Sequence, residues 1–130
     1  LEANEACLPE RETDFCIRLQ NALSEKDGFR RQVVPRLLYR YFAGMADAFS
    51  AIGRLVKSNA PFGLIVGGNH TVLNGTRFDI DTPEHLASIA AARGWHHVET
   101  VHLQTYRRYG LHVNNATSTE ALLILRRRPR

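Results

Sequence analysis

Two polar segments of the 130-residue sequence carry side chains suited to ligand binding. The longer segment, residues 104–119, combines tyrosines, arginines and asparagines, and the shorter one follows an apolar run that ends in Gly67-Gly68. Tyrosine rings can stack on nucleic-acid bases, amides can hydrogen-bond to a base or a phosphate, and arginines can hold a phosphate backbone. We therefore predict nucleic-acid binding at Asn69, His70, Tyr106, Arg107, Arg108, Tyr109, Asn114 and Asn115.

A structural role for the same residues is the alternative. The asparagines would then satisfy turns, the arginines would be solvated, and the tyrosines would cap a sheet.

The histidines do not form a convincing metal site. His96 and His97 are neighbours in a predicted strand, so their side chains point to opposite faces, and no carboxylate or thiol completes a tetrahedral set with His102. A nucleophilic triad is equally unsupported, because His70 beside Thr71 is only a neighbour in a loop. We predict no catalytic and no metal-binding residue.

Three glycosylation acceptor patterns offer a different interpretation of the chain as a secreted binding domain. They are Asn69-His70-Thr71, Asn74-Gly75-Thr76 and Asn115-Ala116-Thr117. Against this interpretation, the sequence has no recognisable signal peptide, and we expect a reducing cytoplasmic location in which Cys7 and Cys16 are free thiols.

The composition is that of a single soluble globular domain, with 44% hydrophobic and 23% charged residues. No apolar run approaches the roughly 18 residues that a membrane span requires. The net charge of +4 invites a nucleic-acid partner, but it is concentrated at the end of the chain, in Arg126, Arg127, Arg128 and Arg130. We expect these arginines to form a solvated, frayed end that could touch phosphate.

The spacing of apolar residues and the positions of turn and cap residues predict the helices and strands that would position these residues. Residues 1–32 form a polar, poorly packed helical lead-in, and an amphipathic helix follows over about 36–58. The apolar run 62–68 predicts a strand buried on both faces, and residues 69–76 form a loop around Asn74-Gly75.

The second half of the chain continues the alternation of helices and strands. A helix is expected over 83–93, with Thr82 as its N-cap, Pro83 at its first position and Gly94 in a left-handed cap. Strands are expected over 97–104 and 120–126. The order strand, helix, strand predicts a parallel crossover, with the last strand antiparallel and the two helices covering the faces of the sheet.

This order, with its residues, resembles the end of an S-adenosylmethionine-dependent DNA methyltransferase that methylates an exocyclic amino group of adenine or cytosine. The resemblance covers roughly residues 33–128. Each matching segment is weakly specific alone, but the segments occur in the same order as in the family. They are Tyr41-Phe42-Ala43-Gly44-Met45, Val66-Gly67-Gly68-Asn69, Ile80-Asp81-Thr82-Pro83 continuing through Leu86 and Ile89-Ala90 to Gly94, and Asn115 followed by Glu120-Ala121-Leu122-Leu123 up to Arg126.

The resemblance implies an α/β fold, the C-terminal part of a Rossmann-like methyltransferase sheet, with a mixed sheet and an antiparallel last strand. Residues 1–32 would be the lead-in and residues 33–130 the C-terminal half of the methyltransferase domain, holding its fifth to seventh strands. The complete enzyme would use S-adenosylmethionine and flip its target base out of DNA.

This chain lacks the family's glycine-rich turn, the acidic residue and the Pro-Pro-Tyr/Phe motif. We therefore expect no cofactor-binding residue and no activity in the isolated chain. Its partners would be DNA and the missing N-terminal half, with self-association through an exposed sheet edge as an alternative and no membrane contact. A non-catalytic DNA-contacting subunit of a split methyltransferase remains the main competing interpretation.

Overall fold

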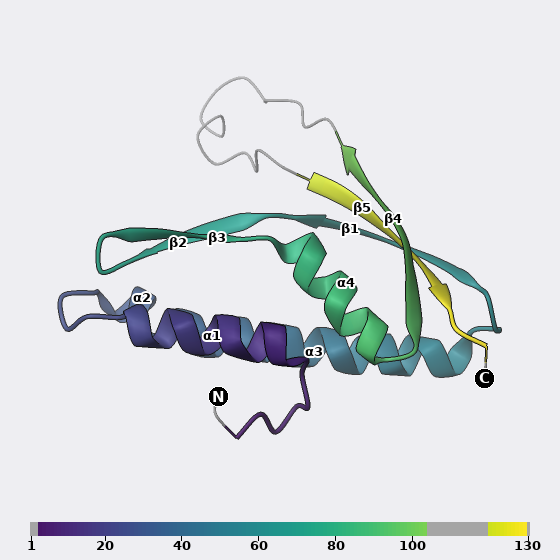
Figure 1. The fold of residues 1–130 in the computed structure, drawn as a ribbon, viewed down its shortest axis with the longest axis horizontal. Helices are drawn as coiled ribbons and strands as arrows, with labels where there is room; N and C mark the ends of the chain where they lie inside the picture. The colour runs from purple at the N-terminus through teal and green to yellow at the C-terminus, as the bar shows by residue number, and fades with distance from the viewer. Residues whose placement is uncertain (1–2, 104–119, 130) are drawn as a thin grey trace.

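The computed structural model describes residues 3–103 and 120–129. Along the described chain, three helices come first, three strands follow, and a fourth helix and two further strands complete the order (Figure 1). The helices are α1 (Glu10–Ala22), α2 (Phe29–Gln32), α3 (Val34–Leu55) and α4 (Thr82–Ala92). The strands are β1 (Pro61–Gly67), β2 (Asn69–Leu73), β3 (Thr76–Ile80), β4 (Trp95–Leu103) and β5 (Glu120–Arg127). The general prediction of an α/β chain and the three long strands are therefore confirmed.

The main sheet places its last strand in the middle. Its strand order is β1-β5-β4, and β5 is antiparallel to both neighbours. The predicted antiparallel pairing of the last strand with its predecessor is confirmed. Strands β1 and β4 run in the same direction, as a crossover connection through α4 requires. Because β5 lies between them, no two neighbouring strands of the described sheet are parallel.

The segment after β1 forms a hairpin, so the prediction of a loop over residues 69–76 is wrong. Strands β2 and β3 pair antiparallel, and Leu73 lies opposite Thr76. Asn74 and Gly75 both have positive φ, at 50° and 75°, as a two-residue type I′ turn requires. The Asp27 carboxylate holds this turn by accepting the Asn74 N–H at 3.1 Å. Backbone hydrogen bonding, first from Ser24 and also from Asn74, lowers the pKa of Asp27.

Helix α4 begins one residue earlier than predicted. Asp81, not Thr82, is the N-cap, and its side chain accepts the Glu84 N–H at 3.4 Å. Pro83 is therefore the second helical residue and still needs no backbone hydrogen bond there. Gly94 has the predicted left-handed conformation, with φ of +90°. Helix α3 ends at Leu55, a few residues before the predicted end.

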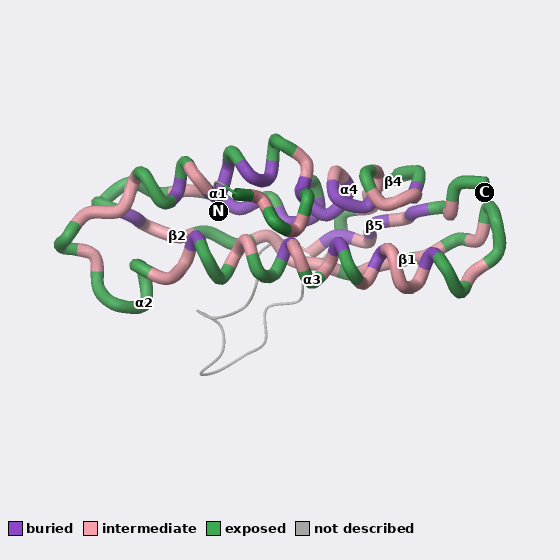
Figure 2. The backbone as a smooth tube through the Cα atoms, turned by 90° about the horizontal axis from the view of Figure 1, so that it is seen from below, coloured by how far each residue is buried: buried purple, intermediate pink, exposed green. Residues whose placement is uncertain are grey.

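Helices α3 and α4 cover the same face of the main sheet, which corrects the prediction that they cover both (Figure 1). From Glu120 to Leu125 the residues of β5 alternate between partly exposed and buried, and two of the buried ones, Leu123 and Leu125, pack with Phe42 and Phe49 of α3. On β1, Ile65 is 62% exposed, so the prediction that this strand is buried on both faces is wrong. Buried positions also recur along α1 and α4 (Figure 2). We call the covered side the inner face.

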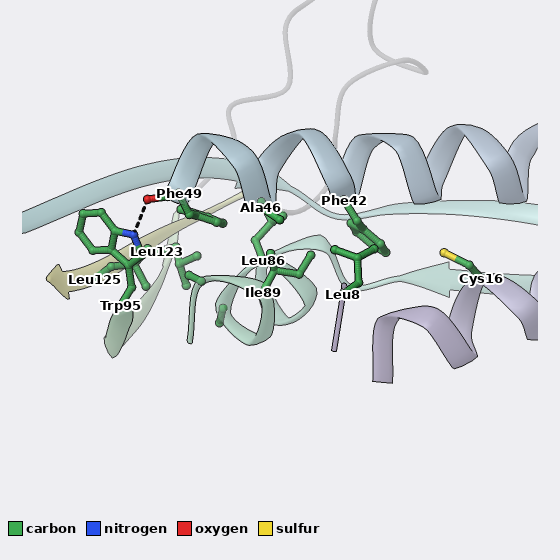
Figure 3. Close-up of a cluster of buried hydrophobic side chains, with 12 residues drawn as sticks. Leu8, Cys16, Phe42, Ala46, Phe49, Leu86, Ile89, Trp95, Leu123 and Leu125 are labelled. Carbon is green, nitrogen blue, oxygen red and sulfur yellow. Dashed lines mark hydrogen bonds between the residues drawn. The ribbon is translucent and has the colours of Figure 1, made fainter. Parts of the chain in front are cut away.

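Trp95 lies at the centre of this packing. Its side chain is fully buried, and its indole N–H donates to the Phe49 carbonyl at 3.0 Å (Figure 3). The Phe62 ring lies 5.6 Å from the Trp95 ring, centroid to centroid. This one residue therefore connects β4 with α3 and β1.

Both ends of the chain are better packed than the sequence suggested. In the lead-in, Phe15, Cys16 and Leu19 of α1 are buried, so this part is not poorly packed. At the other end, β5 extends through Arg127, whose guanidinium donates to the Gly53 carbonyl at 2.9 Å and the Gly94 carbonyl at 2.7 Å. The prediction of a frayed end is therefore wrong as far as Arg127.

Candidate functional site

Only two of the predicted nucleic-acid-binding residues lie within the described structure. Asn69 and His70 are exposed and begin β2, immediately beyond the carboxyl end of β1. The remaining predicted residues fall outside the described residues; they are Tyr106, Arg107, Arg108, Tyr109, Asn114 and Asn115. The exposure of Asn69 and His70 is compatible with a binding role, which stays a prediction.

The surroundings of His70 carry both signs of charge. His70 lies opposite Asp79 in the hairpin, and Arg77 donates from Nε to Asp79 Oδ1 at 3.0 Å on the exposed surface. Asn69 uses its side-chain oxygen to accept the His70 N–H at 2.8 Å. Because Arg77 is already paired with a carboxylate, this hairpin offers a phosphate a weak attraction at most.

A buried polar cluster that the sequence analysis missed links α1 to α4. His85 Nδ1 donates to Glu12 Oε2 at 2.6 Å, and the Ser88 hydroxyl donates to Glu12 Oε1. The Glu12 side chain is fully buried, and His85 is 6% exposed. We call Glu12, His85 and Ser88 the Glu12 cluster. At its rim, Arg11 Nε lies 3.7 Å from Glu12 Oε2.

Aromatic rings enclose the imidazole of this cluster. The ring centroids of Phe15 and Phe42 lie 4.8 Å and 5.2 Å from that of His85. Since a carboxylate taken out of water is costly unless it is paired and hydrogen-bonded, its two donors are what make the position of Glu12 tenable.

The geometry of the Glu12 cluster favours helix docking over catalysis. Its residue types are those of a nucleophilic triad, but the carboxylate lies between the other two groups, and the Ser88 hydroxyl donates to the carboxylate, not to the imidazole. Nearby Cys16 is also unsuited to attack: burial, and then the charge of Glu12, raise the pKa of its thiol to about 12. Both cysteines are free thiols.

A signal for this cluster was present in the sequence. Glu12 lies three, four and seven residues before Phe15, Cys16 and Leu19, so it falls on the apolar side of a helix. His85 and Ser88 are three residues apart, which places them on one side of α4. A charged residue within an apolar stripe indicates a buried polar contact.

The terminal arginines are partly engaged by the fold. Arg126 donates to the Asn59 carbonyl at 2.9 Å. Glycines make room for Arg127: a Cβ on Gly94 would lie 2.7 Å from its Nη1, and one on Gly53 would lie 3.0 Å from its Nε. Of this group, Arg128 is the described residue best placed to contact phosphate.

The described residues do not fit an S-adenosylmethionine site. Gly67-Gly68 leads into β2, so no helix N-terminus follows the glycines to receive a ligand. Among the described residues, no three His, Cys, Asp or Glu side chains gather where they could hold a metal ion. None of the described helices is both long and apolar enough to cross a membrane.

Two of the three glycosylation acceptor patterns can be placed. Asn69 and Asn74 are exposed in the hairpin, and Asn115 lies outside the described residues.

Comparison of the chain with protein-family models, with curated proteins and with solved structures finds no match.

Proposed function

We propose that the chain is the carboxyl-terminal part of a cytoplasmic, S-adenosylmethionine-dependent methyltransferase acting on an exocyclic amino group of a DNA base. The observation that carries the proposal is the unit formed by β1, α4, β4 and the antiparallel β5, in the order that the resemblance implies. The chain's own contribution would be DNA contacts, from Asn69 and His70 beyond β1 and from the polar residues between β4 and β5.

The cofactor would bring the methyl group, and the residues that hold it would belong to another polypeptide segment. This division follows from the poor fit of Gly67-Gly68 to a cofactor turn. A non-catalytic DNA-contacting subunit of a split methyltransferase would use the same residues in the same way.

The isolated chain is expected to bind duplex DNA weakly and with little sequence preference. If about three phosphates are contacted, raising the salt from 50 to 200 mM should weaken binding roughly 40-fold, because each contact releases condensed counterions. Replacing both Arg107 and Arg108 with alanine should make the log-log salt slope shallower by roughly 2. Fluorescence anisotropy with a labelled duplex at several salt concentrations measures this slope.

The matched control replaces Arg30 and Arg31 of α2, two exposed arginines, and should leave the slope unchanged. Tight binding that does not depend on salt, or an equal loss from the control, would contradict this part of the proposal. Calorimetry with S-adenosylmethionine should show no binding to the isolated chain, and micromolar binding would place the chain elsewhere in the fold.

A further inference from the structure

Helix α3 carries a second apolar stripe besides the one that packs on the inner face of the sheet. The packed side holds Phe42, Ala46 and Phe49, which are all fully buried. The residues of the second stripe are alternately three and four positions apart along the whole helix, which is the spacing of a coiled-coil seam. We call this set the α3 stripe; its members are Val34, Leu37, Tyr41, Gly44, Ala48, Ala51 and Leu55.

The α3 stripe is open to solvent. Each of its residues is exposed or half-buried, and Leu37, Tyr41 and Leu55 are 56%, 43% and 86% exposed. The helix runs along one long side of the molecule, and exposed residues recur along it (Figure 2). With 3.6 residues per turn, the stripe lies roughly 140° around the helix from the residues that pack on the sheet. A contiguous exposed apolar surface of this kind is typical of an interaction site.

Gly44, in the middle of the stripe, has no steric reason to be glycine within the described chain. It lies inside a helix, and a Cβ added to it would meet no atom within 4 Å. Apart from proline, glycine is the least favoured residue in the interior of a helix. An absent side chain on an exposed helix leaves room for the close approach of a group from another molecule.

A second copy of α3, laid antiparallel on the first, fits the stripe large against small. In the register that sets Tyr41 against Gly44, each large side chain in the first half of the stripe faces a small one in the second half of the other copy. The facing pairs are Tyr41 with Gly44, Leu37 with Ala48, and Val34 with Ala51. A two-fold axis relates the copies, so each pair occurs twice.

The same register brings opposite charges together beside the seam. Arg40 and Asp47 are exposed, and each comes one position before a stripe residue, on the same flank of α3. In the antiparallel pair, Arg40 of one copy therefore lies beside Asp47 of the other. The Asp47 side chain is 84% exposed, and Arg93 Nη1 lies 3.7 Å from its Oδ1, beyond hydrogen-bond distance. The carboxylate is thus accessible to a second guanidinium.

Other arrangements of two α3 helices lose this match. Shifting the antiparallel register by one heptad brings like charges together, because Arg40 then faces Arg54 in one direction and its own copy in the other. A parallel pair sets Tyr41 against Tyr41 and Gly44 against Gly44, which crowds one layer and leaves the next one empty. The match of size and charge is therefore specific to one arrangement.

We infer that the α3 stripe binds a second copy of this chain, as an antiparallel helix pair with Tyr41 over Gly44 and Arg40 beside Asp47. This dimer leaves the sheet edge free. It does not depend on the proposed methyltransferase role, since no residue assigned to DNA binding takes part.

The length of α3 limits the strength of the dimer. Its 22 residues span roughly 33 Å, and a seam of that length covers roughly 500 Å² of each copy. The total, roughly 1,000 Å², lies at the low end for specific interfaces. We therefore expect a dimer that dissociates in the micromolar range.

Sedimentation equilibrium of the chain, over a concentration series that reaches hundreds of micromolar, should show a monomer–dimer equilibrium. Arg40→Asp alone and Asp47→Arg alone should each weaken the dimer at least fivefold, because each replaces two attractions by two repulsions. The two changes combined should restore the affinity to within twofold of the parent. Arg54→Asp is the matched control: it lies on the same flank of α3 but faces no charge, and should change the affinity less than twofold.

Gly44→Gln separates dimerisation from folding. Glutamine is a better helix former than glycine and has free space within its own copy, so the thermal midpoint of the dilute chain should stay the same or rise. The dimer should weaken at least tenfold, because the new side chain takes the place of Tyr41 of the other copy. Ile65→Lys on the exposed edge strand β1 should change the affinity less than twofold. Circular dichroism checks that each variant folds.

Each of the following results would overturn the inference. The chain stays monomeric throughout the series, Gly44→Gln leaves the dimer intact, or the combined charge reversal binds no more tightly than the single ones. A tighter dimer from Arg54→Asp would indicate the shifted register instead. A dimer weakened by Ile65→Lys would assign self-association to the sheet edge.

Discussion

Replacing Trp95 with alanine is expected to lower the free energy of unfolding by about 3–5 kcal/mol. The side chain is fully buried between α3, β1 and β4, so its removal leaves a cavity and loses the hydrogen bond from the indole to the Phe49 carbonyl. Single domains are stable by only about 5–15 kcal/mol, so much of the total would be lost. Urea unfolding followed by circular dichroism measures the change, because the variant has lost the protein's single tryptophan.

The control for this experiment is Trp95→Phe, which keeps an aromatic ring but removes the indole donor. Its cost should be clearly smaller than that of Trp95→Ala. A loss below about 1 kcal/mol for the alanine variant would mean that α3 does not pack on the sheet as described.

The second large effect is expected from His85→Ala, which should cost about 3–5 kcal/mol. The substitution removes one of the two hydrogen-bond donors of the buried Glu12 carboxylate and leaves a charge poorly compensated between α1 and α4. Urea unfolding at neutral pH measures the loss, with His96→Ala on exposed β4 as the matched histidine control, expected within about 0.5 kcal/mol of the parent.

A double variant distinguishes the loss of the Glu12–His85 hydrogen bond from the loss of apolar packing around it. Glu12→Met combined with His85→Phe replaces the pair with apolar groups and should recover part of the loss, since well-packed apolar groups often substitute for buried ion pairs. If His85→Ala proved nearly neutral, α1 would be held by apolar contacts alone.

The sequence predicted the elements whose signals are local. The apolar run before Gly67-Gly68 identified β1, and the left-handed Gly94 marked the end of α4. The hairpin after β1 was missed although Asn74-Gly75 between two short runs is a strong hairpin signal. Its strands are only five residues each, too short for alternation to stand out.

What the sequence could not predict depends on contacts between distant residues. The position of β5 between β1 and β4 depends on non-local pairing. The apolar stripe of α1 indicates that Glu12 is buried, but not that its donors are His85 and Ser88, which lie more than 70 positions away in the chain. The helices cover one face because α3 and α4 pack against each other as well as against the sheet. Most of the predicted binding residues lie outside the described residues, so their grouping stays a prediction.

Methyl transfer from tritiated S-adenosylmethionine to unmethylated duplex DNA tests the central claim most directly. It is measured with this chain alone, beside fluorescence anisotropy with the same duplex at 50 mM salt. We predict that the chain binds the duplex but incorporates no tritium above a protein-free blank. Incorporation by this chain alone, or no binding to the duplex, would contradict the assignment of the chain as the DNA-contacting part of the enzyme.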